Sequence, residues 1–280
     1  DCERKSTPTI LAAFPPFSIP TLPLQKIIPL SFPNFDTTVP SSYDLPFTKS
    51  FTFAGLKSTP ESKIRDSIID EFVFQINTEP MKTYGICVHV VPARSAIQDL
   101  PFYATKFTKK TIFCFCLLSK TPVFNSHFTF LHYLIGLSLG FVQPNDPCVE
   151  ESPIHRLQSN EILFDSEKSC PFDNLLMSGL FGHHILILNG IPDDFQVEVQ
   201  RYYQTSIYST PKTLAEGFDL YFPPPLMSNA KCILSASLDC LLSNLSPSDI
   251  VDLISALMLD AQVIIVGSSL HQISMTVFAL

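Results

Sequence analysis

The clearest hydrophobic pattern in the chain begins after residue 245. Ser246 and Pro247 have the chemistry of a helix N-cap and a first helical position, and Asp249 stands where a carboxylate can reach back to a free backbone N–H group. Four apolar residues then recur at helical spacing: Ile250, Leu253, Ile254 and Leu257. The pattern predicts a helix that ends near residues 260–261 and buries one apolar face.

A uniformly apolar, mostly β-branched run follows at residues 263–266. Runs of this kind are typical of a central parallel strand that is covered on both faces. The tight exit Gly267-Ser268-Ser269 leads into a second apolar helical pattern over residues 270–280. The sequence therefore predicts a helix, a buried strand and a helix, as in an α/β domain with a parallel sheet.

Short apolar runs alternate with turn and cap signals over residues 27–142. We predict strands at 27–32, 51–54, 71–76, 84–91 and 111–118, a short helix after residues 58–61, and a helix from residue 125 or 126 to about 139. Residues 77–80 have the composition of a turn, which predicts an antiparallel hairpin between the strands on either side. This order of elements predicts an α+β unit built on an antiparallel sheet.

Proline and charge divide the chain into four parts. Residues 1–26 form a Pro-rich tail, which disfavours regular helix or central strand, and residues 143–180 form an acidic linker that also contains prolines. Residues 27–142 and 181–280 are the two predicted domains, and a hairpin of residues 184–188 and 195–200 is predicted in the second. Because the apolar pattern runs to the last residue without a helix-ending signal, we expect the second domain to be partial, truncated at its C-terminus, with some apolar surface uncovered.

Taken in order, several of these segments resemble the DENN domain family, whose members regulate Rab-type small GTPases. The resemblance rests on the Ser-Pro capped helix, the apolar strand ending in Ser-Ser and the Leu-containing helix after it. Four upstream segments add to it: Pro29-Leu30-Ser31-Phe32-Pro33, Phe72-Val73-Phe74, Tyr84-Gly85-Ile86-Cys87 and residues 116–124. The chain departs from the family at Asp260-Ala261-Gln262, where a basic residue is usual. The resemblance implies a longin-like uDENN domain at residues 27–142 and part of an α/β cDENN domain at residues 181–280.

The resemblance also implies a function. A DENN protein acts as a guanine-nucleotide exchange factor, and here the expected partner is a Rab-family small GTPase held in its nucleotide-free form between two lobes. We expect the binding residues among polar groups at strand-to-helix exits: Asn125, Ser126, His127, Ser268, Ser269 and His271. These residue types also fit helix caps and turns. The alternative function is a non-catalytic DENN/longin scaffold in a membrane-trafficking or GTPase-regulating complex.

Composition narrows the classes of partner. The formal net charge of −8 argues against nucleic acid, because nucleic-acid binders gather Lys and Arg on one face. The apolar runs are shorter than the roughly 18 to 20 residues that a bilayer span requires, and no secretory signal is present. The eight cysteines include no Cys-x-x-Cys pair, and Cys114 and Cys116 are predicted to be buried on one strand face. We expect a cytoplasmic protein without a transmembrane segment, whose peripheral membrane association would use other parts of the protein.

Motifs of covalent chemistry are absent from the sequence. The nine glycines form neither a dinucleotide fingerprint nor a phosphate-binding loop, and Gly267-Ser268-Ser269 lacks the second glycine of a nucleophile elbow. The pair His183-His184, and His127 with His132, lack the spacing of metal ligands. We therefore predict no catalytic residues, no cofactor and no metal, and we rank an α/β-hydrolase-type enzyme last.

Overall fold

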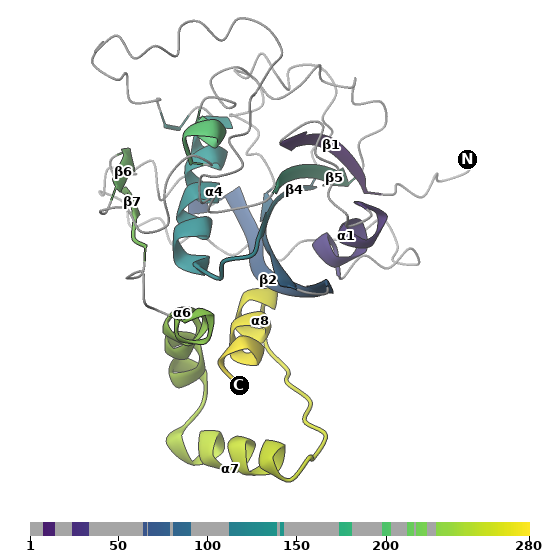
Figure 1. The fold of residues 1–280 in the computed structure, drawn as a ribbon, viewed down its shortest axis with the longest axis vertical. Helices are drawn as coiled ribbons and strands as arrows, with labels where there is room; N and C mark the ends of the chain where they lie inside the picture. The colour runs from purple at the N-terminus through teal and green to yellow at the C-terminus, as the bar shows by residue number, and fades with distance from the viewer. Residues whose placement is uncertain are drawn as a thin grey trace, which may run out of the picture.

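The computed structural model describes residues 8–14, 24–33, 64–65, 67–78, 81–90, 112–138, 141–142, 174–180, 198–202, 212–215, 217–222 and 228–280. The elements in chain order are β1 (Thr9–Phe14), α1 (Leu24–Ser31), β2 (Ile68–Thr78), β3 (Met81–Val90), β4 (Ile112–Ser119), α4 (Phe124–Ser138), β5 (Asn174–Leu180), β6 (Lys212–Ala215), β7 (Phe218–Leu220), α6 (Asn229–Asn244), α7 (Pro247–Met258) and α8 (Leu270–Ala279). Figure 1 shows the sheet between α1 and α4, with α6, α7 and α8 below it.

The main sheet has five strands in the order β1-β5-β4-β3-β2, and all of its pairings are antiparallel. The predicted hairpin is confirmed as β2 and β3, in which Phe72 pairs with Cys87. The predicted third strand is confirmed as β4, which pairs with both β3 and β5. A separate two-stranded sheet joins β6 to β7. The mixed α+β class is therefore confirmed, and no parallel pair occurs among the described strands.

Side chains of β3 and β4 alternate between two apolar clusters, as expected for strands covered on both faces. On one face, residues such as Ile86 and Leu117 pack in a cluster with the buried residues of α4. On the other face, Cys87 and Cys116 pack with Ile27 of α1. Both cysteines predicted to be buried in β4, Cys114 and Cys116, are buried. The sheet is therefore the middle layer of three in this part of the protein (Figure 1).

Three predictions for residues 1–180 differ from the structure. Residues 27–32 were predicted as a strand but lie mostly in α1, where Ile27 and Ser31, one helical turn apart, are both buried. The predicted Pro-rich tail contains β1, which fits between Pro8 and Pro15 and pairs with one strand in the described sheet. The predicted linker ends in β5, which continues the sheet beyond the last proline of that region.

Helices α7 and α8 agree with the sequence analysis, which did not predict α6, but the predicted strand between α7 and α8 is absent. Ser246 and Asp249 form the predicted capping box of α7, and Ser269 caps α8. Residues 261–267 form no strand, and Ile264 and Val266 are 89% and 87% exposed. A parallel strand is buried by neighbouring strands and helices, and no described strand pairs with this segment. The predicted buried face of α7 is also wrong, because α7 has no buried residue. Uncovered apolar surface was expected in this unit and is present.

Some predicted elements lie wholly or partly outside the described residues. The strand at 51–54 and the first strand of the hairpin at 184–188 are not described. The second strand of that hairpin, 195–200, overlaps described residues 198–202, which are helical rather than extended. The short helix predicted after residues 58–61 is described at residues 64–65 and 67, which are helical.

A glycine in β3 allows an aromatic ring to cover the strand. Gly85 pairs with Phe74 of β2, and a Cβ atom at Gly85 would overlap the Phe74 ring. We predict that Gly85→Ala lowers the free energy of unfolding by about 1–3 kcal/mol, as overpacking usually does, measured by urea denaturation. When Phe74 is replaced by Leu, the ring is absent. Gly85→Ala should therefore lower the free energy of unfolding by less in a Phe74→Leu background than in the unchanged chain. Strictly additive effects would contradict the proposed overlap.

Candidate functional site

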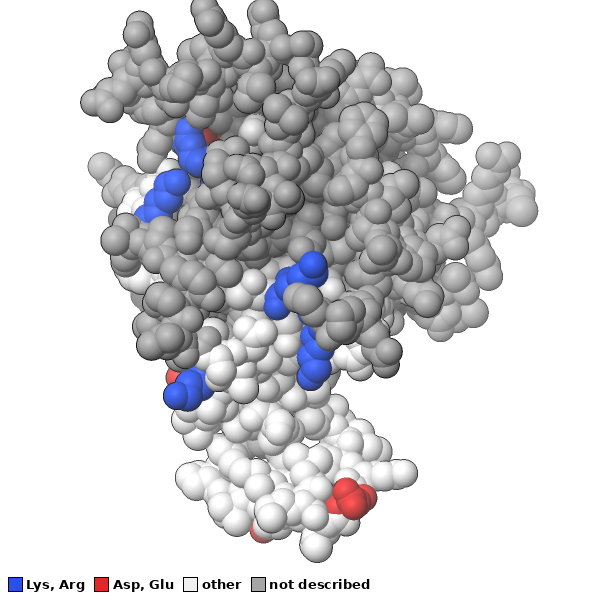
Figure 2. Space-filling view, viewed as in Figure 1, with Lys and Arg blue, Asp and Glu red and all other residues white. Residues whose placement is uncertain are grey.

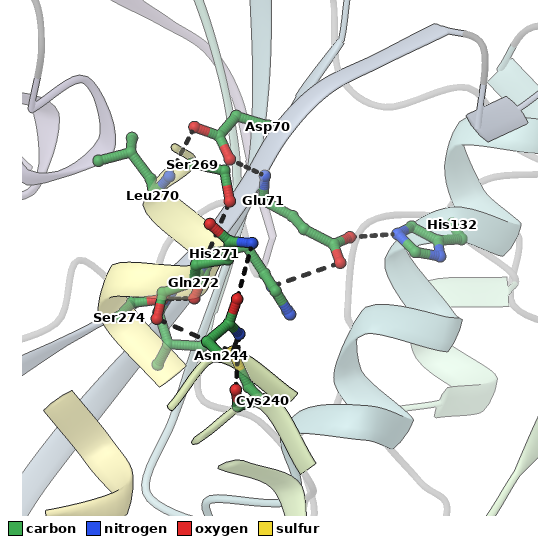
Figure 3. Close-up of polar contacts among 11 residues, drawn as sticks. Asp70, Glu71, His132, Cys240, Asn244, Ser269, Leu270, His271, Gln272 and Ser274 are labelled. Carbon is green, nitrogen blue, oxygen red and sulfur yellow. Dashed lines mark hydrogen bonds and ion pairs between the residues drawn. The ribbon is translucent and has the colours of Figure 1, made fainter. Parts of the chain in front are cut away.

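Polar side chains of three elements meet at one place, which we call the β2–α4–α8 junction and define by Asp70, Glu71, His132 and His271. Glu71 of β2 lies at its centre, and its Oε2 accepts a hydrogen bond from Nε2 of His132 on α4 at 2.9 Å. The second carboxylate oxygen, Oε1, lies 3.4 Å from Nδ1 of His271 on α8. One carboxylate therefore connects two helices that are far apart in sequence (Figure 3).

The N-terminus of α8 is held by the neighbouring carboxylate of Asp70. Oδ2 of Asp70 accepts from the backbone N–H of Leu270 at 3.2 Å, while Oδ1 accepts from the N–H of Glu71 at 2.9 Å. A carboxylate is stabilising at this end of a helix, where the free N–H groups and the positive end of the helix dipole lie. One turn further along α8, Oγ of Ser274 accepts from the N–H of Val73 at 3.3 Å.

Aromatic contacts fix the direction of α8 relative to α4. The Phe278 ring, near the end of α8, lies 5.4 Å from the ring of Phe124 at the start of α4. The His271 ring, at the start of α8, lies 5.8 Å from the ring of Phe128, further along α4. The two helices therefore run in opposite directions where they meet, with the junction at the N-terminal end of α8.

The pKa of Glu71 reports the balance of forces at the junction. Burial by itself would raise this pKa, but the hydrogen bond from His132 and the charges of His132, His271 and Arg65 act in the opposite direction. Together they leave the pKa of Glu71 below its ordinary value. The ionised carboxylate is therefore the form that the junction stabilises.

The structure separates the three residues predicted at the start of α4. Asn125 is exposed, whereas Ser126 and His127 are buried. The Ser126 hydroxyl donates to the backbone carbonyl of Tyr221. The side chains of Ser126 and His127 thus contact other parts of this chain, and Asn125 alone of the three is open to a partner.

His127 has two internal hydrogen bonds that define its tautomer. Nε2 lies 3.0 Å from the backbone carbonyl of Thr121, which can only accept, so Nε2 carries the proton and Nδ1 accepts from the Tyr202 hydroxyl at 3.0 Å. Burial lowers the pKa of His127 to about 4. The imidazole is therefore neutral at physiological pH and holds the passage from β4 into α4.

The residues predicted around the start of α8 are closer together. Ser268 is exposed, and its hydroxyl donates to Oε1 of Gln272 at 2.7 Å. Ser269 accepts from the N–H of Gln272 at 3.2 Å as the N-cap of α8, and His271 is partly buried at the junction. Nε2 of Gln272 also donates to Oδ1 of Asn244 at 3.2 Å, which ties α8 to the end of α6.

The two predicted groups of site residues do not meet. Because α4 and α8 run in opposite directions, Asn125 lies at the end of α4 that contacts Phe278, whereas Ser268 precedes the opposite end of α8. Of the six predicted residues, His271 approaches the middle of α4, through Glu71 and Phe128. A shallow hollow of about 360 Å³ lies between β2 and α8 and is lined by Val73, Phe74, Gln75, Ser274, Val277 and Phe278.

Sequence reasoning missed Asp70, Glu71 and His132 as junction residues. The available signal was a pair of carboxylates at the start of an otherwise largely apolar strand, since such groups need partners when they are half-buried.

Chemically, the junction binds and positions helices. The described residues contain no group of three or more His, Cys, Asp or Glu side chains that could hold a metal ion. Ser268 is hydrogen-bonded to an amide oxygen rather than to a base, so it lacks the activation that a nucleophile needs.

His127 should make stability depend on pH. Its folded pKa of about 4 lies below the ordinary value of 6.5, so its contribution is complete above pH 6.5 and is lost as pH falls toward 4. We predict a loss of about 3 kcal/mol in unfolding free energy between pH 7 and pH 4 from this residue, since each pKa unit is worth about 1.4 kcal/mol. In His127→Gln, which cannot take up a proton, urea denaturation should show a smaller loss over this range. An unchanged pH slope in the variant would contradict the assignment.

Glu71 should act in a lower pH range. Its folded pKa is depressed, so its contribution is present above its ordinary value of 4.5 and is lost as pH falls through the folded value. We predict that Glu71→Gln costs about 1–2 kcal/mol at pH 7, in line with hydrogen bonds to charged groups, and flattens the fall in stability below pH 4.5. The matched control is Asp252→Asn on α7, where the carboxylate is exposed. Equal effects of the two substitutions on urea denaturation would exclude the proposed role of Glu71.

None of the helices in the described residues is long and apolar enough to cross a membrane. The buried polar groups at the start of α4 and at the junction hold elements of this chain together, while Asn125 and Ser268 remain exposed.

No protein-family model, curated protein or solved structure matches the chain.

Proposed function

We propose that this chain is a DENN-type guanine-nucleotide exchange factor for a Rab-family small GTPase. The proposal takes residues 27–142 as a longin-like uDENN domain and residues 181–280 as part of a cDENN domain. The observation that carries it is the direct packing of α8, from the second part, on β2 and α4 of the first part (Figure 3). This contact supports a unit in which two lobes with a fixed relation present one surface to a partner.

Exchange of this kind requires no acid, base or metal. The factor binds the nucleotide-free GTPase more tightly than the nucleotide-bound form, and the difference in affinity weakens nucleotide binding. A thousandfold acceleration corresponds to roughly 4 kcal/mol of differential affinity, which a few interface side chains can supply. The lack of a metal-binding group among the described residues is compatible with this mechanism.

Exposure divides the expected binding residues by role. Asn125 and Ser268 are exposed and would contact the GTPase directly, and His271 would contact it through its accessible part. Ser126 and His127 are buried, so they would position the start of α4 rather than touch the partner. Ser269 would set the start of α8 through its cap. The GTPase would be met on the cytoplasmic side of trafficking membranes.

A second candidate is a non-catalytic scaffold in a membrane-trafficking or GTPase-regulating complex. The observation that favours it is the turn after α7, where Asp260 has a positive φ of 54° and is followed by Ala261 and Gln262. The DENN family usually carries a basic residue in this position. A scaffold would bind its partners without preferring the nucleotide-free state of a GTPase.

We predict that the chain accelerates release of fluorescent GDP from one or two members of a panel of Rab-type GTPases. Asn125→Ala and Ser268→Ala should each lower the rate by about three- to tenfold, as expected for interface side chains of moderate weight. Ser235→Ala, on the exposed surface of α6, is the matched control and should leave the rate unchanged.

The result separates the two candidates. No acceleration with any GTPase, with the chain shown to be folded by its circular dichroism, would reject the exchange factor. Binding without preference for the nucleotide-free form would then favour the scaffold. Acceleration that is equally affected by Ser235→Ala would retain exchange but contradict the proposed contact residues.

A further inference from the structure

The apolar residues of α7 and of the segment after it form an exposed surface. We call this the α7 surface and define it by Val251, Ile254, Met258, Leu259, Ile264 and Val266. Met258 and Leu259 are each 81% exposed, and no residue of α7 is buried. Large apolar side chains exposed along a whole helix are unusual in a monomeric protein, and contiguous apolar patches often mark a binding site.

The spacing of these residues indicates what shape of partner fits. Val251, Ile254 and Met258 are three and then four residues apart, so they lie in one stripe along the helix. A stripe of this kind packs against the apolar stripe of a second helix, with ridges of one lying in grooves of the other. In Figure 1, α7 lies farthest from the sheet, where a second helix has room to approach.

The charge around the α7 surface indicates what kind of helix. Residues 232–280 contain no Lys or Arg, and their four acidic residues are Asp239, Asp249, Asp252 and Asp260, all of which are exposed. On the face shown in Figure 2, the part formed by the C-terminal helices around α7 carries acidic atoms and no basic ones. A negatively charged region with no basic residue to offset it attracts a partner with Lys or Arg beside its own apolar stripe and repels an acidic one.

We propose that the α7 surface binds a basic amphipathic helix of a partner protein. This binding is separate from nucleotide exchange and does not depend on it. The acidic charge of residues 232–280 disfavours an anionic membrane surface, because bilayers of that kind attract basic rather than acidic helices. It also disfavours a second copy of this chain, since two α7 surfaces would bring like charges together.

The test uses two synthetic peptides and the full chain. One peptide repeats Leu-Lys-Lys-Leu-Leu-Lys-Leu, which places leucine on one helical face and lysine on the other, and the second replaces each lysine by glutamate. We expect the lysine peptide to bind with at least about tenfold higher affinity than the glutamate peptide, measured by fluorescence anisotropy. The difference should shrink when the salt concentration rises from about 0.05 M to about 0.5 M, because salt screens exposed charges.

Matched variants locate the binding. Ile254→Ser should weaken binding of the lysine peptide by about tenfold, as for an interface anchor, whereas Leu234→Ser on α6 should change it by less than about twofold. The two side chains have similar exposure, 47% and 45%, so the control removes a comparable apolar group from another surface. Asp252→Lys should weaken binding more than Asp239→Lys does. Unchanged thermal unfolding would show that the variants are folded.

Three outcomes would overturn the proposal. The first is equal binding of the two peptides, and the second is equal loss in Ile254→Ser and Leu234→Ser. The third is evidence for a different occupant. That evidence would be sedimentation of the chain with vesicles of phosphatidylserine and phosphatidylcholine, or self-association of the chain in analytical ultracentrifugation, provided that Ile254→Ser abolishes it. The vesicle result would assign the surface to a membrane, and the self-association result to a second copy of the chain.

Discussion

The arrangement of the C-terminal part depends on the outer edge of β2. An edge strand presents backbone N–H and C=O groups that no further strand satisfies, and unpaired groups of this kind are costly when buried and prone to wrong pairing when exposed. Here the N–H of Glu71 donates to Asp70, and that of Val73 donates to Ser274 of α8. Because Asp70 also accepts from the start of α8, satisfying the edge and placing the helix are one event.

Several polar residues that were expected to form a binding site instead make contacts within the chain. His127, with a neutral ring, closes the passage from β4 to α4 through Thr121 and Tyr202. Glu71 joins two imidazoles, so a carboxylate that would be costly alone is stabilised by partners from two helices. Buried polar groups that contact other elements favour one arrangement of those elements, and Asn125 and Ser268 are the exposed groups among the predicted residues at the starts of α4 and α8.

Local patterns in the sequence predicted the elements whose stability is local. The β2–β3 hairpin follows from its alternating residues and turn, and the start of α7 follows from its capping box. The short apolar run at residues 27–32 is compatible with either a strand or a helix, and contact with the sheet decides for α1. The junction was beyond prediction because Asp70 and Leu270 are 200 positions apart, and no local pattern reports such a contact. Residues 263–266 have strand composition, but composition alone provides no neighbouring strand.

The exposed α7 follows from the difference between forming a helix and burying one. Ser246 and Asp249 satisfy the first N–H groups of α7 by mutual hydrogen bonds, which define where the helix begins without any tertiary contact. A helix of 12 residues is marginal in water by itself, and most helical stability in proteins comes from packing of an apolar face. Since α7 buries no residue, that stabilisation is still available to a partner. Part of the binding free energy would then be used to order α7, so a partner that covers Val251, Ile254 and Met258 would stabilise the helix as it binds.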